Sequence, residues 1–327
     1  MLPRERVIKV IQHKRPDRIP VYGWLHPDSS DSISRIFGSV EAFEDLYEFD
    51  YTHLFASPVL YAEETLQAVR DSRNGTIEPA ALFEAQISDP NDTAHYESMK
   101  ERIEHYKDHK GRFVYVQTPG IFEDHNTIIG MEQHLVYLLT HEDEMRKLYE
   151  RHVEWTSTFA HNCIDLGVDM IHVSDDWGTQ RCPLISPNTW WNTIYPCHRK
   201  LAGEVKQHGA FLSLHSDGNI NEMIEGIIKI GYDVVHPWQE SAGMDFGVFR
   251  ERYMNYFTVM GGLDVQTVIG FRKFEKLRSE IERIVSMFSE GGLLFCTSHF
   301  VQPHCTIEEL TFAFDTIYYL VRKYGIS

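Results

Sequence analysis

Two residues with metal-binding side chains, His215 and Asp217, end an apolar run in the stretch LSLHSDGNI at 212–220. Alternate residues of an extended strand point to the same face, so both side chains are expected to aim at one point. A nitrogen and an oxygen ligand suit a zinc ion that keeps an open coordination position. The alternative is a turn, in which Asp217 binds its own backbone or Asn219 caps the next helix.

The elements that must position these residues form a repeating pattern, in which short apolar runs alternate with helical segments. We expect eight strands, at 18–25, 51–55, 113–118, 170–174, 210–214, 234–237, 257–260 and 293–297. Parallel strands need crossover connections, and this alternation supplies them. The sequence therefore predicts an α/β fold, a (β/α)8 TIM barrel that forms one domain over residues 1–327, with an irregular excursion around 71–112. An open doubly wound sheet is the alternative, although no GxGxxG follows the first strand.

Helix signals separate the expected strands. A helix capped at Thr140 is expected to reach about Leu166, and an apolar stripe over 220–231 predicts another that ends at a glycine. A further amphipathic helix is expected over 271–290. Ser186-Pro187 is typical of a cap followed by proline at the first helical position, whereas Pro196 is expected to break or kink its helix.

In a barrel of this kind the active site is built from the loops that follow the strands. Asp175 and Asp176 carry the strongest signal there, because adjacent carboxylates after a buried strand repel each other unless a cation, a proton or a donor lies between them. Asp264 has the alternative role of a loop cap. Other candidates at strand ends are Tyr22, Trp24, His26, Gln117, Trp177, Gln180, Gln239 and His299.

A third metal ligand is needed beside His215 and Asp217. His299, after the last strand, can supply it if the fifth and eighth strands meet across the barrel mouth. His172 and His236 lie inside apolar runs and are expected to be core residues instead.

Composition limits the classes of function. The chain of 327 residues has 48 Asp and Glu against 31 Lys and Arg, a net charge of −17, and an acidic surface disfavours nucleic acid and anionic membranes as partners. No stretch reaches the roughly 18–20 apolar residues of a membrane helix. The five cysteines include no CxxC pair, which disfavours a disulfide framework. We therefore expect a cytoplasmic protein.

Several blocks of sequence resemble the uroporphyrinogen decarboxylase superfamily, and more narrowly its branch of corrinoid-dependent methyltransferases and O-demethylases. The resemblance covers nearly the whole chain and implies a (β/α)8 barrel. The blocks are PRERVIKVIQHKRPDRIPV at 3–21, GVDMIHVSDDWGTQRCPLISPNTW at 167–190, HGAFLSLHSDGNI at 208–220, GYDVVHPWQESAGMD at 231–245, GGLD at 261–264 and GGLLFCTSHFVQPHCTIEEL at 291–310.

Two departures narrow what the resemblance implies. The decarboxylase holds its substrate's carboxylates with an Arg-rich stretch after the first strand, whereas this chain reads IPVYGWLHPDSSD at 19–31 and offers Arg181 as a candidate cation.

Methyltransferases of the superfamily that activate thiols bind zinc through His-x-Cys and a later Cys. His215 matches the His, but Asp217 and His299 stand where the two Cys would be. With fewer thiolates zinc is a stronger Lewis acid, which suits an ether oxygen; a metal-free site is the alternative.

The resemblance implies a methyltransferase that moves a methyl group from a small methoxylated compound to the cobalt of a corrinoid (cobalamin) on a separate protein. Zinc on His215, Asp217 and His299 would polarise the leaving oxygen, and the catalytic residues would be Asp175, Asp176 and Asp264. Substrate contacts are expected from Tyr22, Trp24, His26, Trp177 and Gln239. The alternatives are a metal-free lyase that decarboxylates a smaller acid, and a binding protein without catalysis. A homodimer is one of the partner arrangements that stay open.

Overall fold

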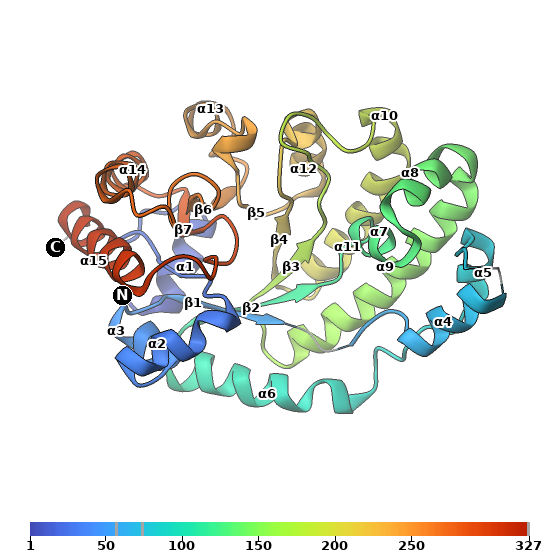
Figure 1. Ribbon diagram of the computed structural model, residues 1–327, viewed down its shortest axis with the longest axis horizontal. Coiled ribbons are helices and arrows are strands. Elements are labelled where there is room, and N and C mark those ends of the chain that lie inside the picture. Colours follow the sequence, from blue (N-terminus) through green and yellow to red (C-terminus); the bar gives the residue numbers. More distant parts are fainter. Residues whose placement is uncertain (56–57, 73–74, 326–327) are drawn as a thin grey trace. The chain divides into compact units, whose positions relative to one another are not determined.

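The computed structural model of the protein describes residues 1–55, 58–72 and 75–325 (Figure 1). Its strands follow one another in chain order in a parallel sheet and alternate with helices, which confirms the α/β fold of the TIM-barrel type. The strands are β1 (Tyr51–Phe55), β2 (Phe113–Thr118), β3 (Met170–Ser174), β4 (Phe211–His215), β5 (Val234–His236), β6 (Thr258–Leu263) and β7 (Leu293–Thr297).

The contacts within the chain divide it into two compact units, each assembled from separate stretches of sequence. Unit 1 comprises Met1–His53, His105–Val114 and Asp233–Ser327, and unit 2 comprises Leu54–Glu104 and Tyr115–Tyr232. β3 and β4 therefore belong to unit 2, and β5, β6 and β7 to unit 1. The single domain expected over residues 1–327 stays a prediction.

The expected first strand, 18–25, is an irregular segment, so the prediction of eight strands is wrong for the described residues. The segment forms two isolated bridges, between Val21 and Phe295 of β7 and between Leu25 and Val301. Pro20 has no N–H to give to a ladder, which prevents a regular strand at this point. Its carbonyl still accepts a hydrogen bond from the N–H of Phe295 at 2.9 Å, so the segment lies against β7 without becoming a strand.

Most strand boundaries agree with the prediction. β1, β2, β3 and β7 have the expected bounds, and the other strands differ from expectation by one to three residues at their ends. β4 begins and ends one residue later than expected because His215 still pairs with Ser174 of β3. β6 continues to Leu263 because its two glycines pair with β7.

The helices that accompany β3 and β4 in unit 2 confirm two of the predicted helix signals. Ser186 caps its helix by accepting a hydrogen bond from the N–H of Thr189 at 3.1 Å, and Gly231 ends another in the left-handed conformation. These helices are α7 (Glu123–Ile129), α8 (Met131–Thr140), α9 (Glu142–Asp165), α10 (Pro187–Thr189), η4 (Trp190–Ile194), α11 (Tyr195–Gln207), η5 (Asn221–Met223) and α12 (Ile224–Ile230).

Two helix predictions in unit 2 need correction. Thr140 does not cap α9, because its hydroxyl donates back to the carbonyl of Val136 at 2.9 Å as the last residue of α8, and His141 precedes α9 instead. Pro196 does not break its helix. It lies in the first turn of α11, where the helical run passes from the π-helix η4 into α11 without interruption.

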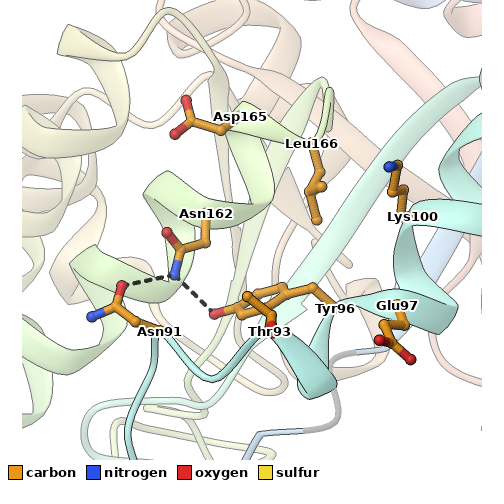
Figure 2. A pocket seen from close by; sticks show the side chains of 8 residues that line it. All are labelled: Asn91, Thr93, Tyr96, Glu97, Lys100, Asn162, Asp165 and Leu166. Carbon is orange, nitrogen blue, oxygen red and sulfur yellow. Dashed lines mark hydrogen bonds between the residues drawn. The ribbon is translucent and has the colours of Figure 1, made fainter.

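The excursion around 71–112 is helical rather than irregular over much of its length. Its helices are α4 (Glu63–Ser72), α5 (Pro79–Glu84), η2 (Thr93–His95), α6 (Glu97–Ile103) and η3 (Glu104–His109). In unit 2, α6 and the turn before it form a surface cavity of about 410 Å³ with α9. Figure 2 shows Asn162 of α9 bonded there to Tyr96 and Asn91. The residues that line this cavity include none of the predicted site residues.

Unit 1 contains the remaining helices. The amphipathic helix expected over 271–290 is α14. The helices are α1 (Pro3–Ile11), η1 (Pro27–Ser29), α2 (Ser30–Phe37), α3 (Val40–Leu46), η6 (Glu240–Ala242), α13 (Phe246–Arg252), α14 (Phe274–Met287) and α15 (Ile307–Tyr324). Among the described residues, none of the helices combines the length and the apolar character needed to cross a bilayer.

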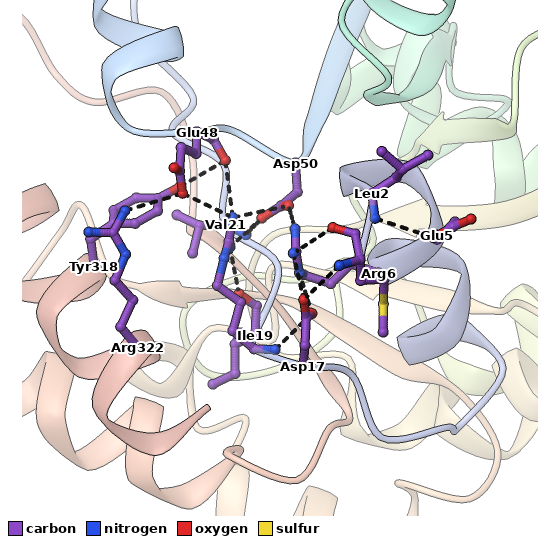
Figure 3. A network of polar contacts seen from close by, with 12 residues as sticks. Leu2, Glu5, Arg6, Asp17, Ile19, Val21, Glu48, Asp50, Tyr318 and Arg322 are labelled. Carbon is purple, nitrogen blue, oxygen red and sulfur yellow. Dashed lines mark hydrogen bonds and ion pairs between the residues drawn. The ribbon is translucent and has the colours of Figure 1, made fainter. Parts of the chain in front are cut away.

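A buried ionic network in unit 1 explains the charged residues near the N-terminus (Figure 3). Asp50 is fully buried and pairs with Arg6 and with Arg18, whose Nη1 lies 2.7 Å from its carboxylate. Its carboxylate also accepts the N–H of Val21 at 2.8 Å. A buried charge persists only when it is paired, so this network fixes α1 and the segment around Val21 to the start of β1.

Candidate functional site

Three metal-binding side chains of unit 2 meet where β3 and β4 end. His215 Nε2 lies 3.7 Å from Oδ1 of Asp176 and 4.0 Å from Oδ1 of Asp217, and one ligand atom from each residue lies within 4.8 Å of the others. The register of the two strands produces this arrangement, because Ser174 pairs with His215 and the N–H of Asp175 donates to the His215 carbonyl at 2.9 Å. The loops after both strands therefore start side by side.

This cluster fits a divalent metal ion. Tetrahedral zinc with ligand bonds of about 2.0–2.1 Å places its ligand atoms about 3.3 Å apart, so small side-chain rotations would close the cluster on an ion. The side chain of His215 is 5% exposed, whereas those of Asp176 and Asp217 are 31% and 32% exposed. Burial lowers the pKa of His215 against the opposing effect of the Asp176 charge, which favours the neutral imidazole that binds metals.

The backbone holds one of these carboxylates in place. The N–H of Asp217 donates to Oδ1 of Asp176 at 2.6 Å, and the N–H of Trp177 donates to the hydroxyl of Ser216 at 2.9 Å. Hydrogen bonds of this kind orient a metal ligand from outside its coordination sphere. The loops after β3 and β4 therefore support each other at the cluster.

Asp175 occupies a different environment from its neighbour Asp176. It is fully buried, and its Oδ1 accepts the N–H groups of Phe122 and Glu123 at 2.9 and 2.7 Å. Its Oδ2 accepts from Nε1 of Trp177 at 2.9 Å and from Nε2 of His198 at 2.8 Å. Each carboxylate oxygen of Asp175 thus accepts two hydrogen bonds. Asp175 thereby connects the end of β3 to α7 and α11. The prediction that it acts in catalysis stays untested.

Glu123, at the start of α7, is a site residue that the sequence analysis missed. Its carboxylate accepts a hydrogen bond from the backbone of Asp176 and lies 3.5 Å from the hydroxyl of Ser174. Burial and the charges of Asp176 and Asp175 raise the pKa of Glu123 to about 8. It follows Thr118, the end of β2, by five residues, so a search of only the positions directly after each strand passes over it.

Trp177 was expected to contact the substrate, but its side chain is packed inside unit 2. It is fully buried, its indole contacts the rings of Trp190 and His198, and its N–H is held by Asp175. Its role in substrate binding stays a prediction.

Several predicted residues lie together in unit 1. The Trp24 ring contacts the rings of His299, Phe300 and His236, with centroids 5.2, 4.4 and 5.5 Å away. The His26 ring meets the edge of Phe300 at 5.4 Å. Residues 24–26, the end of β5 and the loop after β7 thus form an aromatic and imidazole cluster that contains three of the predicted residues.

The other predicted residues of unit 1 lie elsewhere. Tyr22 packs against Phe49 and Tyr51. Gln239 and Asp264 both line a small cavity of about 20 Å³. Asp264 also accepts the N–H of Gln266 at 2.6 Å, which is the loop-capping role given above as its alternative.

The predicted metal set is divided between the units. His215 and Asp217 lie together in unit 2, whereas His299 belongs to unit 1. The carboxylate that accompanies His215 and Asp217 within unit 2 is Asp176, which the sequence analysis placed among the catalytic residues.

Ionisable residues at the carboxyl ends of parallel strands are the arrangement found in TIM-barrel enzymes. Residues 85–319 match the family described as Uroporphyrinogen decarboxylase (URO-D). This match covers well over half of the chain, so the protein belongs to the uroporphyrinogen decarboxylase family, which confirms the resemblance at the level of the family.

Two solved structures align with the chain. A methyltransferase from Methanosarcina mazei aligns with a TM-score of 0.69 and 11% identity over 98% of this chain and 99% of its own. A B12-independent methionine synthase from Shewanella sp. W3-18-1, in complex with selenomethionine, aligns with a TM-score of 0.45 and 14% identity over 69% of this chain and 67% of its own. At 11% identity the first likeness shows a common fold. No curated protein matches the sequence significantly.

Proposed function

We propose that the protein is a methyltransferase that moves the methyl group of a small methoxylated compound, for example a phenyl methyl ether, to the reduced cobalt of a corrinoid on a separate protein. The observation that carries this proposal is the cluster of Asp176, His215 and Asp217 at the ends of β3 and β4. Two carboxylates and an imidazole bind zinc as a Lewis acid that polarises an ether oxygen. Membership of the family and a methyltransferase with the same fold support it.

Each residue has a stated part in the proposal. His215, Asp217 and Asp176 would hold the ion within unit 2, and His299 stays a predicted further ligand. Glu123 contacts the backbone of Asp176, so it is placed to give a proton to the oxygen that leaves when the carbon–oxygen bond breaks and the methyl group passes to cobalt. Trp24 and His26 stay predicted substrate contacts.

The test combines a metal measurement with an activity measurement. The protein is purified without oxygen, chelators or a His tag, and its zinc content is measured beside methyl transfer from methoxybenzene derivatives to free cob(I)alamin. We expect wild-type protein to hold zinc and transfer methyl groups, and His215→Gln to lose both. His141→Gln, which removes an exposed histidine outside the cluster, is the matched control. Metal-free protein that transfers methyl groups at full rate would disprove the role of zinc.

A metal-free lyase that decarboxylates a smaller acid is the second candidate, and the description of the family favours it. Arg181, exposed in the loop after β3, is its candidate cation for a substrate carboxylate. Release of carbon dioxide from a small carboxylic acid by metal-free protein, with no methyl acceptor present, would support this candidate over the methyltransferase.

A further inference from the structure

A second group of metal-binding side chains in unit 2 lies on α9 and α11, outside the cluster at the strand ends. His161 is on α9, Glu204 is on α11, and His208 is the residue that follows α11. One ligand atom from each lies within 4.8 Å of the others. Nε2 of His161 is 3.4 Å from Oε2 of Glu204. The ring centroids of His161 and His208 are 3.7 Å apart.

Hydrogen bonding leaves a nitrogen of His208 available for a metal. Nδ1 of His208 lies 2.9 Å from the backbone carbonyl of Glu204. A carbonyl oxygen only accepts, so Nδ1 carries the proton and the lone pair of the neutral ring is on Nε2. Metal-binding histidines usually donate their other N–H to a carbonyl or a carboxylate in this way.

His161 provides an independent observation. Its Nε2 is buried and, within the part of the chain that the structure describes, makes no well-aligned hydrogen bond; the Glu204 carboxylate lies 3.4 Å away as an ion-pair partner. A buried polar atom whose partner is distant and poorly aligned calls for an explanation such as an ion. An ion between this nitrogen and the carboxylate would satisfy both groups.

The helices hold these ligands on one face. Glu204 and His208 are four residues apart, so they are neighbours on the surface of α11, and α9 packs against α11. The side chains of His161 and Glu204 are 26% and 36% exposed, so the group lies near the surface, although Nε2 of His161 itself is covered. Asp165, one turn after His161, adds negative charge nearby.

We propose that His161, Glu204 and His208 form a second metal site, which binds a divalent transition-metal ion such as zinc and ties α9 to α11. Two nitrogens and one carboxylate oxygen are ligands that zinc accepts, with water in the fourth position. The site does not depend on the proposed methyl transfer. Because α9 leads into β3 and α11 into β4, an ion here stabilises the two strands whose ends form the candidate site.

The test is a zinc titration of metal-free protein against a competing coloured chelator, followed by thermal unfolding with and without zinc. The His215→Gln protein isolates the second site, because it lacks the central ligand of the first. We expect this protein to bind zinc and to unfold at a higher temperature in its presence. Adding His161→Gln or Glu204→Gln to it should abolish both effects, whereas adding His141→Gln should preserve them.

The inference is overturned if His215→Gln protein binds no zinc, or if its zinc binding survives both added substitutions. The activity assay separates this inference from the proposed function. His161→Gln alone should lose one bound zinc per chain and keep its methyl transfer, if wild-type protein has that activity. Absence of methyl transfer in wild-type protein would contradict the proposed function and leave the zinc titration of the second site unaffected.

Discussion

Nε2 of His198 lies 2.8 Å from Oδ2 of Asp175, and both side chains are fully buried. Nδ1 of the same ring lies 2.6 Å from the hydroxyl of Tyr232, so the imidazole is held from both sides. This bond fixes the residue after β3 to α11. The next residue, Asp176, is 31% exposed and faces His215. Adjacent aspartates thus have separate roles, one as a buried support and the other as a candidate ligand.

The first prediction compares these two aspartates. Asp175→Ala leaves the N–H groups of Phe122, Glu123, Trp177 and His198 without their acceptor, and we expect it to lower the free energy of unfolding by about 3–5 kcal/mol. Asp176→Ala removes a partly exposed acceptor and should cost about 1–2 kcal/mol. Denaturant unfolding of both variants in the presence of a chelator measures the difference. Equal losses would contradict the assignment of Asp175 as a support.

The second prediction concerns the metal ligands. Removing a group that only hydrogen-bonds to a metal ligand weakens metal binding by roughly 10–100-fold. We expect a larger loss of zinc affinity from each of Asp176→Asn, His215→Gln and Asp217→Asn, because each removes a ligand itself. Zinc competition with a chelator in His161→Gln protein measures the effect without the second site. His299→Gln is the informative comparison. If it abolishes binding while Asp176→Asn does not, the ligand set His215, Asp217 and His299 predicted from the sequence is the correct one.

The sequence predicts the strands well because an apolar run between polar residues is a local signal. β1, β2, β3 and β7 have their expected bounds. Asp176 follows β3, and His215 and Asp217 lie at the end of β4. Because parallel strands end at the same edge of a sheet, these residues are expected to lie close together. The segment 18–25 is apolar enough to be predicted as a strand. It does not form one because Pro20 lacks the backbone N–H that a strand donates to its neighbour.

The parts of the site that the sequence does not reveal depend on distant contacts. The sequence does not distinguish the adjacent aspartates Asp175 and Asp176. Asp175 becomes the buried support because Phe122, Glu123 and His198 donate hydrogen bonds to it. Glu123 lies beyond the end of β2, in a helix whose first residues are bonded to Asp175 after β3. Its closeness to Asp176 is therefore a product of tertiary structure.

The third prediction tests Glu123 as the proton donor. Glu123→Gln keeps the size and the hydrogen-bonding capacity of a neutral carboxyl group but has no proton to release. If Glu123 protonates the leaving oxygen, we expect methyl transfer to fall by about 10²–10⁴-fold while zinc content stays unchanged. Rates with donors whose leaving oxygen is less basic should fall less. An unchanged rate for the most basic leaving group would show that Glu123 only positions Asp176.

The fourth prediction concerns stability in acid. Burial and the neighbouring His125 lower the pKa of His134 to about 3, and the ring is neutral between Asn126 and Tyr149, at 2.7 and 2.6 Å. The folded-state pKa lies below the unfolded value, so the unfolded chain takes up the proton first as pH falls. Stability from this group is present above about pH 6.5 and is lost between pH 6.5 and pH 3, by up to about 1.4 kcal/mol per pH unit.

Replacing His134 isolates this effect from the other titrating groups. In His134→Gln the free energy of unfolding should fall less steeply between pH 6 and pH 5 than in wild-type protein, whatever the absolute loss from the altered hydrogen bonds. His141→Gln, at an exposed histidine, should keep the wild-type slope. Denaturant unfolding at several pH values measures the slopes, and parallel curves for wild type and His134→Gln would contradict the prediction.

The last prediction concerns the contact between the loops that carry the cluster. A Cβ on Gly178 would lie 2.6 Å from the carbonyl oxygen of Asp217 and 2.7 Å from the N of Asn219, and backbone atoms do not rotate away as a side chain does. We therefore expect Gly178→Ala to cost about 1–3 kcal/mol of stability and to weaken zinc binding by displacing Asp217, although no ligand is changed. Gly203→Ala, on α11 with no atom within 4 Å of its Cβ, should instead stabilise its helix by about 1 kcal/mol and keep zinc affinity. If Gly178→Ala binds zinc as tightly as Gly203→Ala, the close approach of the loops does not position Asp217.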